Sequence, residues 1–158
     1  MNITVIGVGK IKEKFFTDAL KEYSKRLGRF GSFEIIEIPD ESIPQNPSEK
    51  QQEQIKKREG QKILSKLKPQ SLVIAMCIEG EEVTSTELAG IISDAALKYG
   101  RVFFIIGGSL GLSEEVKRRS DMRLSFGRIT LPHQLMRVVL TEQIYRAFMI
   151  NSGSAYHK

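Results

Sequence analysis

Residues 72–78 and 102–106 are two almost uninterrupted apolar runs, and they constrain the fold more than any other feature of the sequence. A strand with one face in solvent alternates apolar and polar residues, so a continuous apolar run is typical of a strand buried on both faces. A helical pattern follows each run, after Ser85 and after Ser113, and serine is a good helix cap. This order predicts an α/β fold with a mostly parallel sheet flanked by helices.

The rest of the chain continues the alternation of strands and helices. Further strands are predicted over residues 2–8, 32–38 and 122–126. Longer helices are predicted over residues 15–27, 47–67, 85–100 and 132–150. The second of these is expected to begin with Pro47 in its first position. The 158 residues contain no internal repeat, low-complexity tract or linker, so a single domain over residues 1–158 is expected.

The composition excludes several classes of protein. Cys77 is the only cysteine, and His133 and His157 are the only histidines, so neither an internal disulfide nor a cysteine or multi-histidine metal site is expected. No apolar segment reaches the roughly 18 residues that span a bilayer, and the N-terminus lacks the pattern of a signal peptide. A cytoplasmic protein without a membrane anchor is therefore predicted. The net charge of +5 favours a polyanionic partner without proving one.

Two glycine-rich segments follow predicted strands. Gly7-Val8-Gly9 is reminiscent of a dinucleotide-binding turn, but Lys12 occupies the place of the third glycine. This departure weakens the alternative of a nicotinamide-dependent reductase. Residues 107–111, Gly-Gly-Ser-Leu-Gly, lead from a buried strand into a capped helix. They are equally consistent with close approach to a ligand and with a tight turn that needs glycine.

The predicted helix over residues 47–67 is polar in its first half and carries many cations. Its early turns are expected to project into solvent. The cations favour a solvated helical face over an RNA contact, and both interpretations remain open.

The last predicted helix is apolar around most of its circumference. A helix of this kind is buried on more than one side, and in a small domain the second side is most simply a subunit interface. A homodimer is therefore expected. The tail that follows ends in Tyr156-His157-Lys158. It is either a solvated terminus or a set of groups that reach a substrate, with an aromatic ring able to stack on a base.

Several segments together resemble the SPOUT-class family of large-subunit ribosomal RNA methyltransferases H. The segments with the most specific resemblance are residues 106–112, 124–137, 142–147 and 155–158, and residues 6–10, 36–39 and 57–60 also agree. The resemblance covers essentially the whole chain. It implies a SPOUT-type α/β fold with a C-terminal trefoil knot, S-adenosylmethionine as cofactor, a homodimer, and N3-methylation of a pseudouridine in a stem-loop of 23S rRNA.

The resemblance also implies a set of site residues. The cofactor-binding positions fall on Met76, Gly107, Phe126, Gly127, Arg128, Ile129, Thr130 and Leu131. The family often has leucine where this chain has Met76, and either side chain forms an apolar wall. Arg146, Tyr156 and His157 match positions associated with substrate or catalysis. His133 is equally consistent with orienting the loop and with contacting the substrate. No metal is implied.

The chemistry of the implied substrate suggests how these side chains act. N3 of pseudouridine carries a proton and attacks poorly until that proton is lost, so a base or a cation that stabilises the anion would help. His157 is the leading candidate for the base and Arg146 for the cation, while Tyr156 positions or stacks on the ring. Because no further RNA-binding domain is evident, we expect recognition of the assembled large subunit or 70S ribosome. The main alternative is an RNA-binding or assembly protein without methyl transfer.

Overall fold

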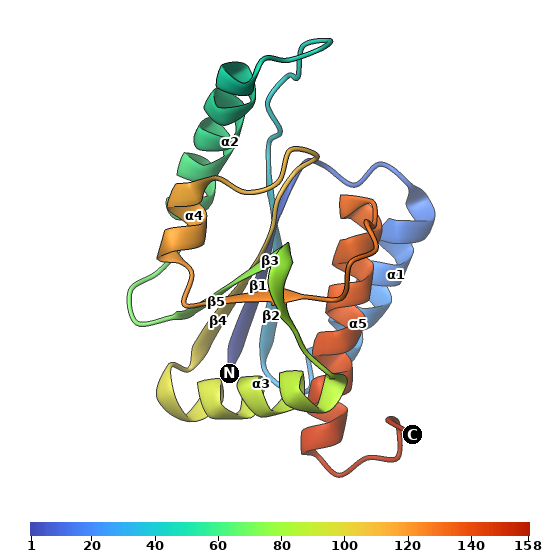
Figure 1. The fold of residues 1–158 in the computed structure, drawn as a ribbon. Coiled ribbons are helices and arrows are strands. Elements are labelled where there is room, and N and C mark those ends of the chain that lie inside the picture. The colour runs from blue at the N-terminus through green and yellow to red at the C-terminus, as the bar shows by residue number, and fades with distance from the viewer.

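The computed structural model describes all residues, 1–158, and contains a five-stranded sheet in the order β2-β1-β4-β3-β5 (Figure 1). Every strand pair is parallel. The strands are β1 (Asn2–Val8), β2 (Ser32–Ile38), β3 (Leu72–Glu82), β4 (Arg101–Ile106) and β5 (Met122–Ser125). The predicted α/β architecture with a parallel sheet is thus confirmed, and the predicted strands all lie where they were expected.

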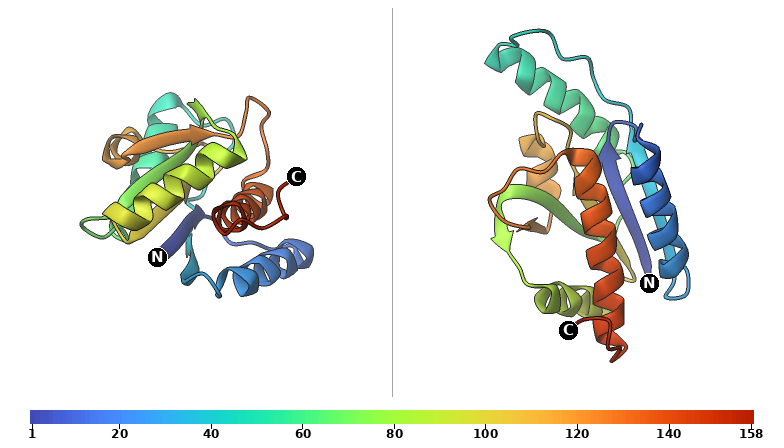
Figure 2. Two further views of the ribbon diagram at one scale, coloured as in Figure 1. Left: turned by 90° about the horizontal axis from the view of Figure 1, so that it is seen from below. Right: turned by 90° about the vertical axis from the view of Figure 1, so that its right-hand side faces the viewer.

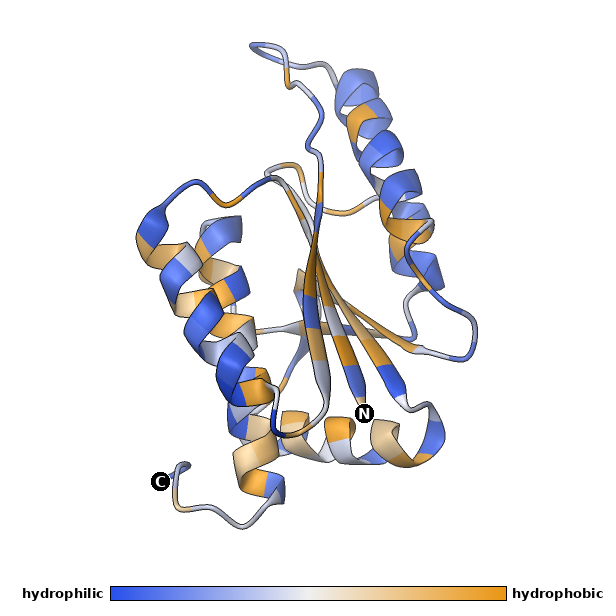
Figure 3. Cartoon of the chain, turned by 180° about the vertical axis from the view of Figure 1, so that it is seen from behind, coloured by the Kyte–Doolittle hydropathy of each residue, from blue (hydrophilic) through white to orange (hydrophobic).

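Helices cover both faces of the sheet (Figure 2). The helices are α1 (Lys14–Leu27), α2 (Glu49–Leu64), α3 (Ser85–Lys98), α4 (Glu114–Arg119) and α5 (His133–Asn151). On one face α5 lies against both α1 and α3, and on the other α2 lies against α4. The first half of α2 extends beyond the sheet and is largely exposed, as its polar sequence predicts (Figures 1 and 3).

The core is divided between the two faces, which explains the continuous apolar runs. Ile74 on β3 and Phe104 on β4 belong to the core under α1, α3 and α5. Their neighbours Val73 and Phe103 belong to the core under α2 and α4. Alternate residues of a strand point to opposite faces, so a strand covered on both sides must be apolar throughout.

Two helix starts differ from the prediction. α2 begins at Glu49 and not at Pro47. Ser48 precedes it, and the Ser48 hydroxyl accepts a bond from the N–H of Gln51 while the Gln51 side chain accepts from the N–H of Ser48. Thr84, not Ser85, makes the same reciprocal arrangement with Glu87 at α3. This capping box satisfies two free N–H groups at once, which a single serine or proline cannot do. Ser113 caps α4 as predicted.

β3 is longer than its apolar run indicates. Leu124 on β5 is the register partner of both Met76 and Glu81, so the residues between them bulge out of the sheet. Gly80 allows the strand to return, because a Cβ atom there would lie 2.6 Å from the carbonyl carbon of Leu124. The bulge carries Cys77 and its neighbours to the edge of the sheet where the strands end.

α5 is buried on more than one side, as predicted, and neighbours within the same chain account for part of this burial. Leu140, Ile144 and Ala147 are fully covered, whereas Val138 and Val139 remain half-buried. The homodimer therefore remains a prediction, as does the trefoil knot. No helix of the structure is both long enough and apolar enough to cross a membrane.

Candidate active site

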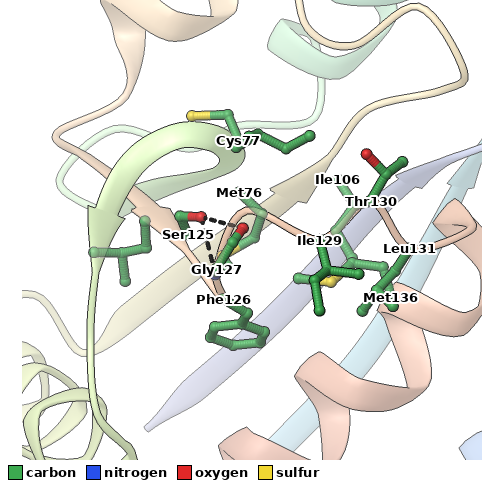
Figure 4. Close-up of a pocket in the computed structure, with 12 residues that line it drawn as sticks. Met76, Cys77, Ile106, Ser125, Phe126, Gly127, Ile129, Thr130, Leu131 and Met136 are labelled. Atoms are coloured by element: carbon green, nitrogen blue, oxygen red, sulfur yellow. Dashed lines mark hydrogen bonds between the residues drawn. The ribbon is translucent and has the colours of Figure 1, made fainter.

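A pocket of about 120 Å³ lies where β3, β4 and β5 end (Figure 4). Its walls come from these strand ends, from the loop after β5 and from the first turns of α5. They are mostly apolar and comprise Met76, Cys77, Ile78, Ile106, Leu124, Ser125, Phe126, Gly127, Ile129, Thr130, Leu131 and Met136. Ligands of parallel α/β sheets bind at this edge, beyond the carboxyl ends of the strands.

A wider groove of about 680 Å³ adjoins the pocket and shares Met76, Ile106 and Leu131 with it. The groove is also lined by residues 107–112, which form the loop after β4. Six of the eight residues that the sequence assigned to the cofactor therefore line the pocket, and Gly107 lines the groove beside it. Arg128 is the exception, because its side chain is exposed and lines neither.

The loop after β5 is held by its own first residues. The hydroxyl of Ser125 donates to the carbonyl of Gly127 at 3.0 Å and accepts from the N–H of Gly127 at 3.1 Å. Gly127 has φ +112°, a conformation that other residues adopt only with strain. The start of the loop is thereby held, and its residues from Gly127 to Leu131, apart from Arg128, line the pocket (Figure 4).

The glycine turn after β4 is a tight turn that needs glycine, and it also lines the groove. A Cβ atom at Gly107 would lie 2.8 Å from the carbonyl carbon of Gly111, so the turn needs glycine there. Gly111 has φ +85°, and its N–H donates to the carbonyl of Gly108 at 3.0 Å. The same residues line the groove, so the tight turn also brings bare backbone to the site.

The first glycine segment does not form a dinucleotide site. Arg137 of α5 is fully buried beneath it, and its Nη2 donates to the carbonyls of Val8 at 2.6 Å and Gly9 at 2.7 Å. A Cβ atom at Gly7 would lie 2.6 Å from Cζ of Arg137. The space that a pyrophosphate would need is therefore filled by a guanidinium, which removes the physical basis for a nicotinamide enzyme.

Arg146, Tyr156 and His157 lie together and are organised by Glu142. Nε and Nη2 of Arg146 donate to Oε1 of Glu142 at 3.0 and 2.6 Å, and the hydroxyl of Tyr156 donates to the same oxygen at 3.1 Å. The guanidinium of Arg146 stacks over the ring of Tyr156, 4.7 Å from its centroid. Nη1 of Arg146 lies 3.4 Å from Nδ1 of His157. The tail is thus attached to α5 through one carboxylate.

This arrangement sets the protonation of two of the groups. Burial and the bond to Glu142 raise the pKa of Tyr156 to about 12, so the phenol is neutral at physiological pH. The bond to Glu142 also raises the pKa of Arg146, which keeps its charge. Because a guanidinium only donates, its contact with His157 requires a lone pair on Nδ1.

The pocket and this cluster lie at different heights along α5. Met136 lines the pocket, and the rise of a helix places Arg146 about 15 Å further along the axis. None of the three predicted catalytic residues lines the pocket. Gln143 lies between the two, since it lines a hollow with Phe126 and Gly127 and donates to Glu142 at 2.7 Å.

His133 stands at the wall of the groove, close to Gly9. Burial and the charge of Arg137 lower the pKa of its imidazole, so His133 is neutral at physiological pH. No role was predicted for Glu142 or Arg137, although both lie within segments that resemble the family. These two charged residues in an otherwise apolar helix could have indicated a role, because a buried charge in a helix requires a partner.

Comparison with known families agrees with this geometry. A family model described as predicted SPOUT methyltransferase matches residues 1–157. The chain belongs to the SPOUT methyltransferase family. The resemblance stated from the sequence is thereby confirmed.

Relatives within the SPOUT family match along their full length. Proteins named "Ribosomal RNA large subunit methyltransferase H" from Lactiplantibacillus plantarum and Lactococcus lactis subsp. cremoris are 54% and 55% identical, with 100% of each chain covered. One of the same name from Oenococcus oeni is 54% identical, covering 100% of this chain and 99% of the relative.

A solved structure shares the fold of this chain. A probable methylase family protein from Haemophilus influenzae superposes with a TM-score of 0.54 at 12% identity, over 99% of this chain and 70% of that one. At this identity the likeness concerns the fold alone.

Proposed function

We propose that this SPOUT protein uses S-adenosylmethionine to N3-methylate a pseudouridine in a stem-loop of 23S rRNA, within the assembled large subunit or 70S ribosome. The observation that carries the proposal is the full-length identity of 54% to relatives named for large-subunit rRNA methylation. The methyltransferase family and the pocket at the carboxyl edge of the sheet support it.

The residues at this edge fit the cofactor. Met76, Ile106 and Met136 offer an apolar wall for the adenine ring of the cofactor, and the bare backbone at Gly107 allows close approach. The backbone of residues 126–131 supplies amide and carbonyl groups for the edge of the base. When bound, S-adenosylmethionine supplies a methyl group already activated by its sulfonium charge. The main task of the protein is therefore alignment.

We assign substrate roles to the cluster at the tail. Arg146 keeps its charge and stabilises the anion that forms when N3 loses its proton. Tyr156 stays protonated, which excludes it as the base and leaves it to position or stack on the ring.

His157 is the proposed base, and its contact with Arg146 restricts when it can act. With the Nδ1 lone pair engaged by Arg146, a neutral imidazole carries its proton on Nε2 and has no free site for another. The contact must therefore open before His157 accepts the N3 proton, and an arriving anionic substrate would draw Arg146 away from it.

The proposal includes a homodimer, a knotted C-terminal part and a cytoplasmic location. Leu97 on α3 is 85% exposed, and Val138 and Val139 on α5 are only half-buried in a single chain. Incompletely covered apolar side chains on both helices support a subunit interface on this side of the sheet. No metal enters the proposed reaction.

The decisive experiment is mass spectrometry of 23S rRNA from cells with and without the protein. We expect one methylated pseudouridine to be lost on deletion and restored by the wild-type chain. Calorimetric titration with S-adenosylmethionine is the second test, because absence of binding would favour an RNA-binding protein without methyl transfer. Equal activity on a naked stem-loop and on intact ribosomes would refute recognition of the assembled particle.

A further inference from the structure

The loop between β1 and α1 lies at the same edge of the sheet as the pocket (Figure 1). It carries Lys10 and Lys12, and both side chains are exposed without a carboxylate within 4 Å. Lys14, which follows, is paired with Asp18 at 2.6 Å, and Glu13 is the one exposed carboxylate within the loop. Two cations are therefore available to a partner at the rim of the site.

The backbone of this loop is fixed from three directions. The N–H of Gly9 donates to the carbonyl of Ile38 at 2.7 Å, and the N–H of Ile11 donates to Glu37 at 2.8 Å. The N–H of Lys12 reaches the side chain of Gln134 in the first turn of α5 at 3.4 Å. From beneath, Arg137 bonds the carbonyls of Val8 and Gly9. The positions from which the two lysines extend are thus tied to the helix that borders the pocket.

An exposed aromatic ring follows these cations closely in the chain. Phe15, in the first turn of α1 and three residues after Lys12, is 65% exposed and packs against Phe16, with ring centroids 4.4 Å apart. A phenyl ring in solvent next to unpaired cations is the arrangement on which an unpaired base stacks while its phosphates contact the lysines.

Three exposed carboxylates lie near this loop, on Glu34, Glu37 and Asp40. Glu37 accepts from Ile11 and Arg137, and Glu34 accepts from Thr4 at 3.1 Å. The hollow that Glu34 and Glu37 line is also lined by Lys10, Lys21 and Arg137, so cations outnumber carboxylates there and a phosphate is attracted to the loop.

We propose that Lys10, Lys12 and Phe15 form an RNA-binding rim that holds the backbone and one unpaired base of the substrate RNA beside the methyl-transfer pocket. This inference rests on the proposed function for the identity of the RNA, and it assigns the contact to a part of the chain outside the cofactor and tail residues. Phosphate contacts set position and salt dependence, and the stacked base favours a loop over a duplex.

The test measures binding and methylation separately, with large ribosomal subunits from cells that lack the protein. For the double variant Lys10→Ala/Lys12→Ala we expect about a tenfold weaker affinity and a salt dependence, d log K/d log[salt], that is shallower by about 2. For Phe15→Ala we expect a loss of about tenfold. In both variants the affinity for S-adenosylmethionine and the methylation rate at saturating subunits should equal those of the wild type.

Matched controls lie at the opposite edge of the sheet. Lys66→Ala/Lys68→Ala removes the same charge from exposed, unpaired lysines, and Tyr99→Ala removes an exposed aromatic ring. These variants should bind subunits as the wild type does. An equal loss of subunit affinity in the rim and control variants would overturn the proposal, because it would show that binding depends on non-specific charge. A change in the oligomeric mass of Phe15→Ala would also overturn it, because it would show that Phe15 contacts protein and not RNA.

The remaining outcomes separate this inference from the proposed function. If the wild type binds subunits through the rim but transfers no methyl group, the proposed function fails and the rim stands. If methylation proceeds and the rim variants bind normally, the rim is wrong and the function stands. If the wild type does not bind the subunits, both are overturned.

Discussion

Gly7 on β1 and Arg137 on α5 are packed so closely that a larger residue at position 7 would clash with the arginine side chain. A Cβ atom on Gly7 would lie 2.6 Å from Cζ of Arg137, whose guanidinium bonds the carbonyls of Val8 and Gly9 and lies 3.4 Å from Glu37. Its Nε has no partner, and burial lowers the pKa of the side chain. Glycine at position 7 therefore makes room for Arg137, whose bonds join the first strand to the last helix.

Arg137→Met should lower the free energy of unfolding by about 3–5 kcal/mol, because two buried carbonyls and Glu37 lose their donor. Gly7→Ala alone should lower it by about 1–3 kcal/mol through overpacking. The double variant should lose less unfolding free energy than the two single variants together, since the shorter, uncharged side chain of methionine leaves room for the methyl group of alanine. Urea unfolding measures all three values, and strict additivity would show that the two residues do not share this space.

Gly127→Ala should weaken binding of S-adenosylmethionine by up to about tenfold and lower the stability by about 1–2 kcal/mol, because alanine is strained at φ +112°. Nothing lies within 4 Å of the added Cβ atom, so the effect comes from the backbone and not from a clash. Gly90→Ala is the control, since Gly90 sits within α3 with equally open space and should gain about 1 kcal/mol. Calorimetry measures the affinity for S-adenosylmethionine, and thermal unfolding measures the stability. Unchanged cofactor affinity in Gly127→Ala would separate this loop from the cofactor.

The pKa of Tyr156, raised to about 12, predicts a specific alkaline behaviour. A folded-state pKa above the unfolded value of 10 means that the stabilising contribution is complete below pH 10 and is lost as the pH rises toward 12. The wild type should therefore lose more stability than Tyr156→Phe between pH 9.5 and 11.5, roughly the window of the shift. Urea unfolding at the two pH values measures the difference. Parallel losses in both proteins would show that the Tyr156–Glu142 bond does not hold the tail.

His157→Ala should lower the single-turnover methylation rate at saturating ribosomal substrate by about 10²- to 10⁴-fold, the usual contribution of a general base. The affinity for S-adenosylmethionine should not change, because His157 does not line the pocket. Lys158→Ala, an exposed neighbour, serves as the control for disturbance of the tail. Full single-turnover activity in His157→Ala would exclude the imidazole as the base.

Glu142→Gln tests the organisation of the cluster. It removes the charge that Arg146 and Tyr156 share, and the methylation rate should fall while binding of the cofactor is retained. The pKa of Tyr156 should move back toward its ordinary value, which spectrophotometric titration of the phenol can follow when compared with Tyr156→Phe. A phenol that still titrates near 12 would assign the shift to burial instead.

The sequence by itself determined the parallel sheet, the strand positions and most of the pocket. Apolar runs such as residues 102–106 reveal burial on both faces because alternation is a local property of a strand. The glycine turn and the loop after β5 lie at strand ends, and in a parallel sheet those ends meet at one edge. Local patterns and this rule of topology indicated the edge of the sheet, whereas the individual pocket residues were implied by the resemblance to the family.

Only the tertiary structure decided which polar groups meet. Arg137 and Val8 are 129 residues apart, and Tyr156 reaches Glu142 from beyond the end of α5, so no periodicity relates either pair. The return of β3 past its bulge likewise depends on how Gly80 fits against the backbone of Leu124, which belongs to a different strand. Local patterns report how much of a side chain is buried, whereas the partner of a buried charge is chosen by packing between distant segments. The partnership of Gly7 with Arg137 is of this second kind.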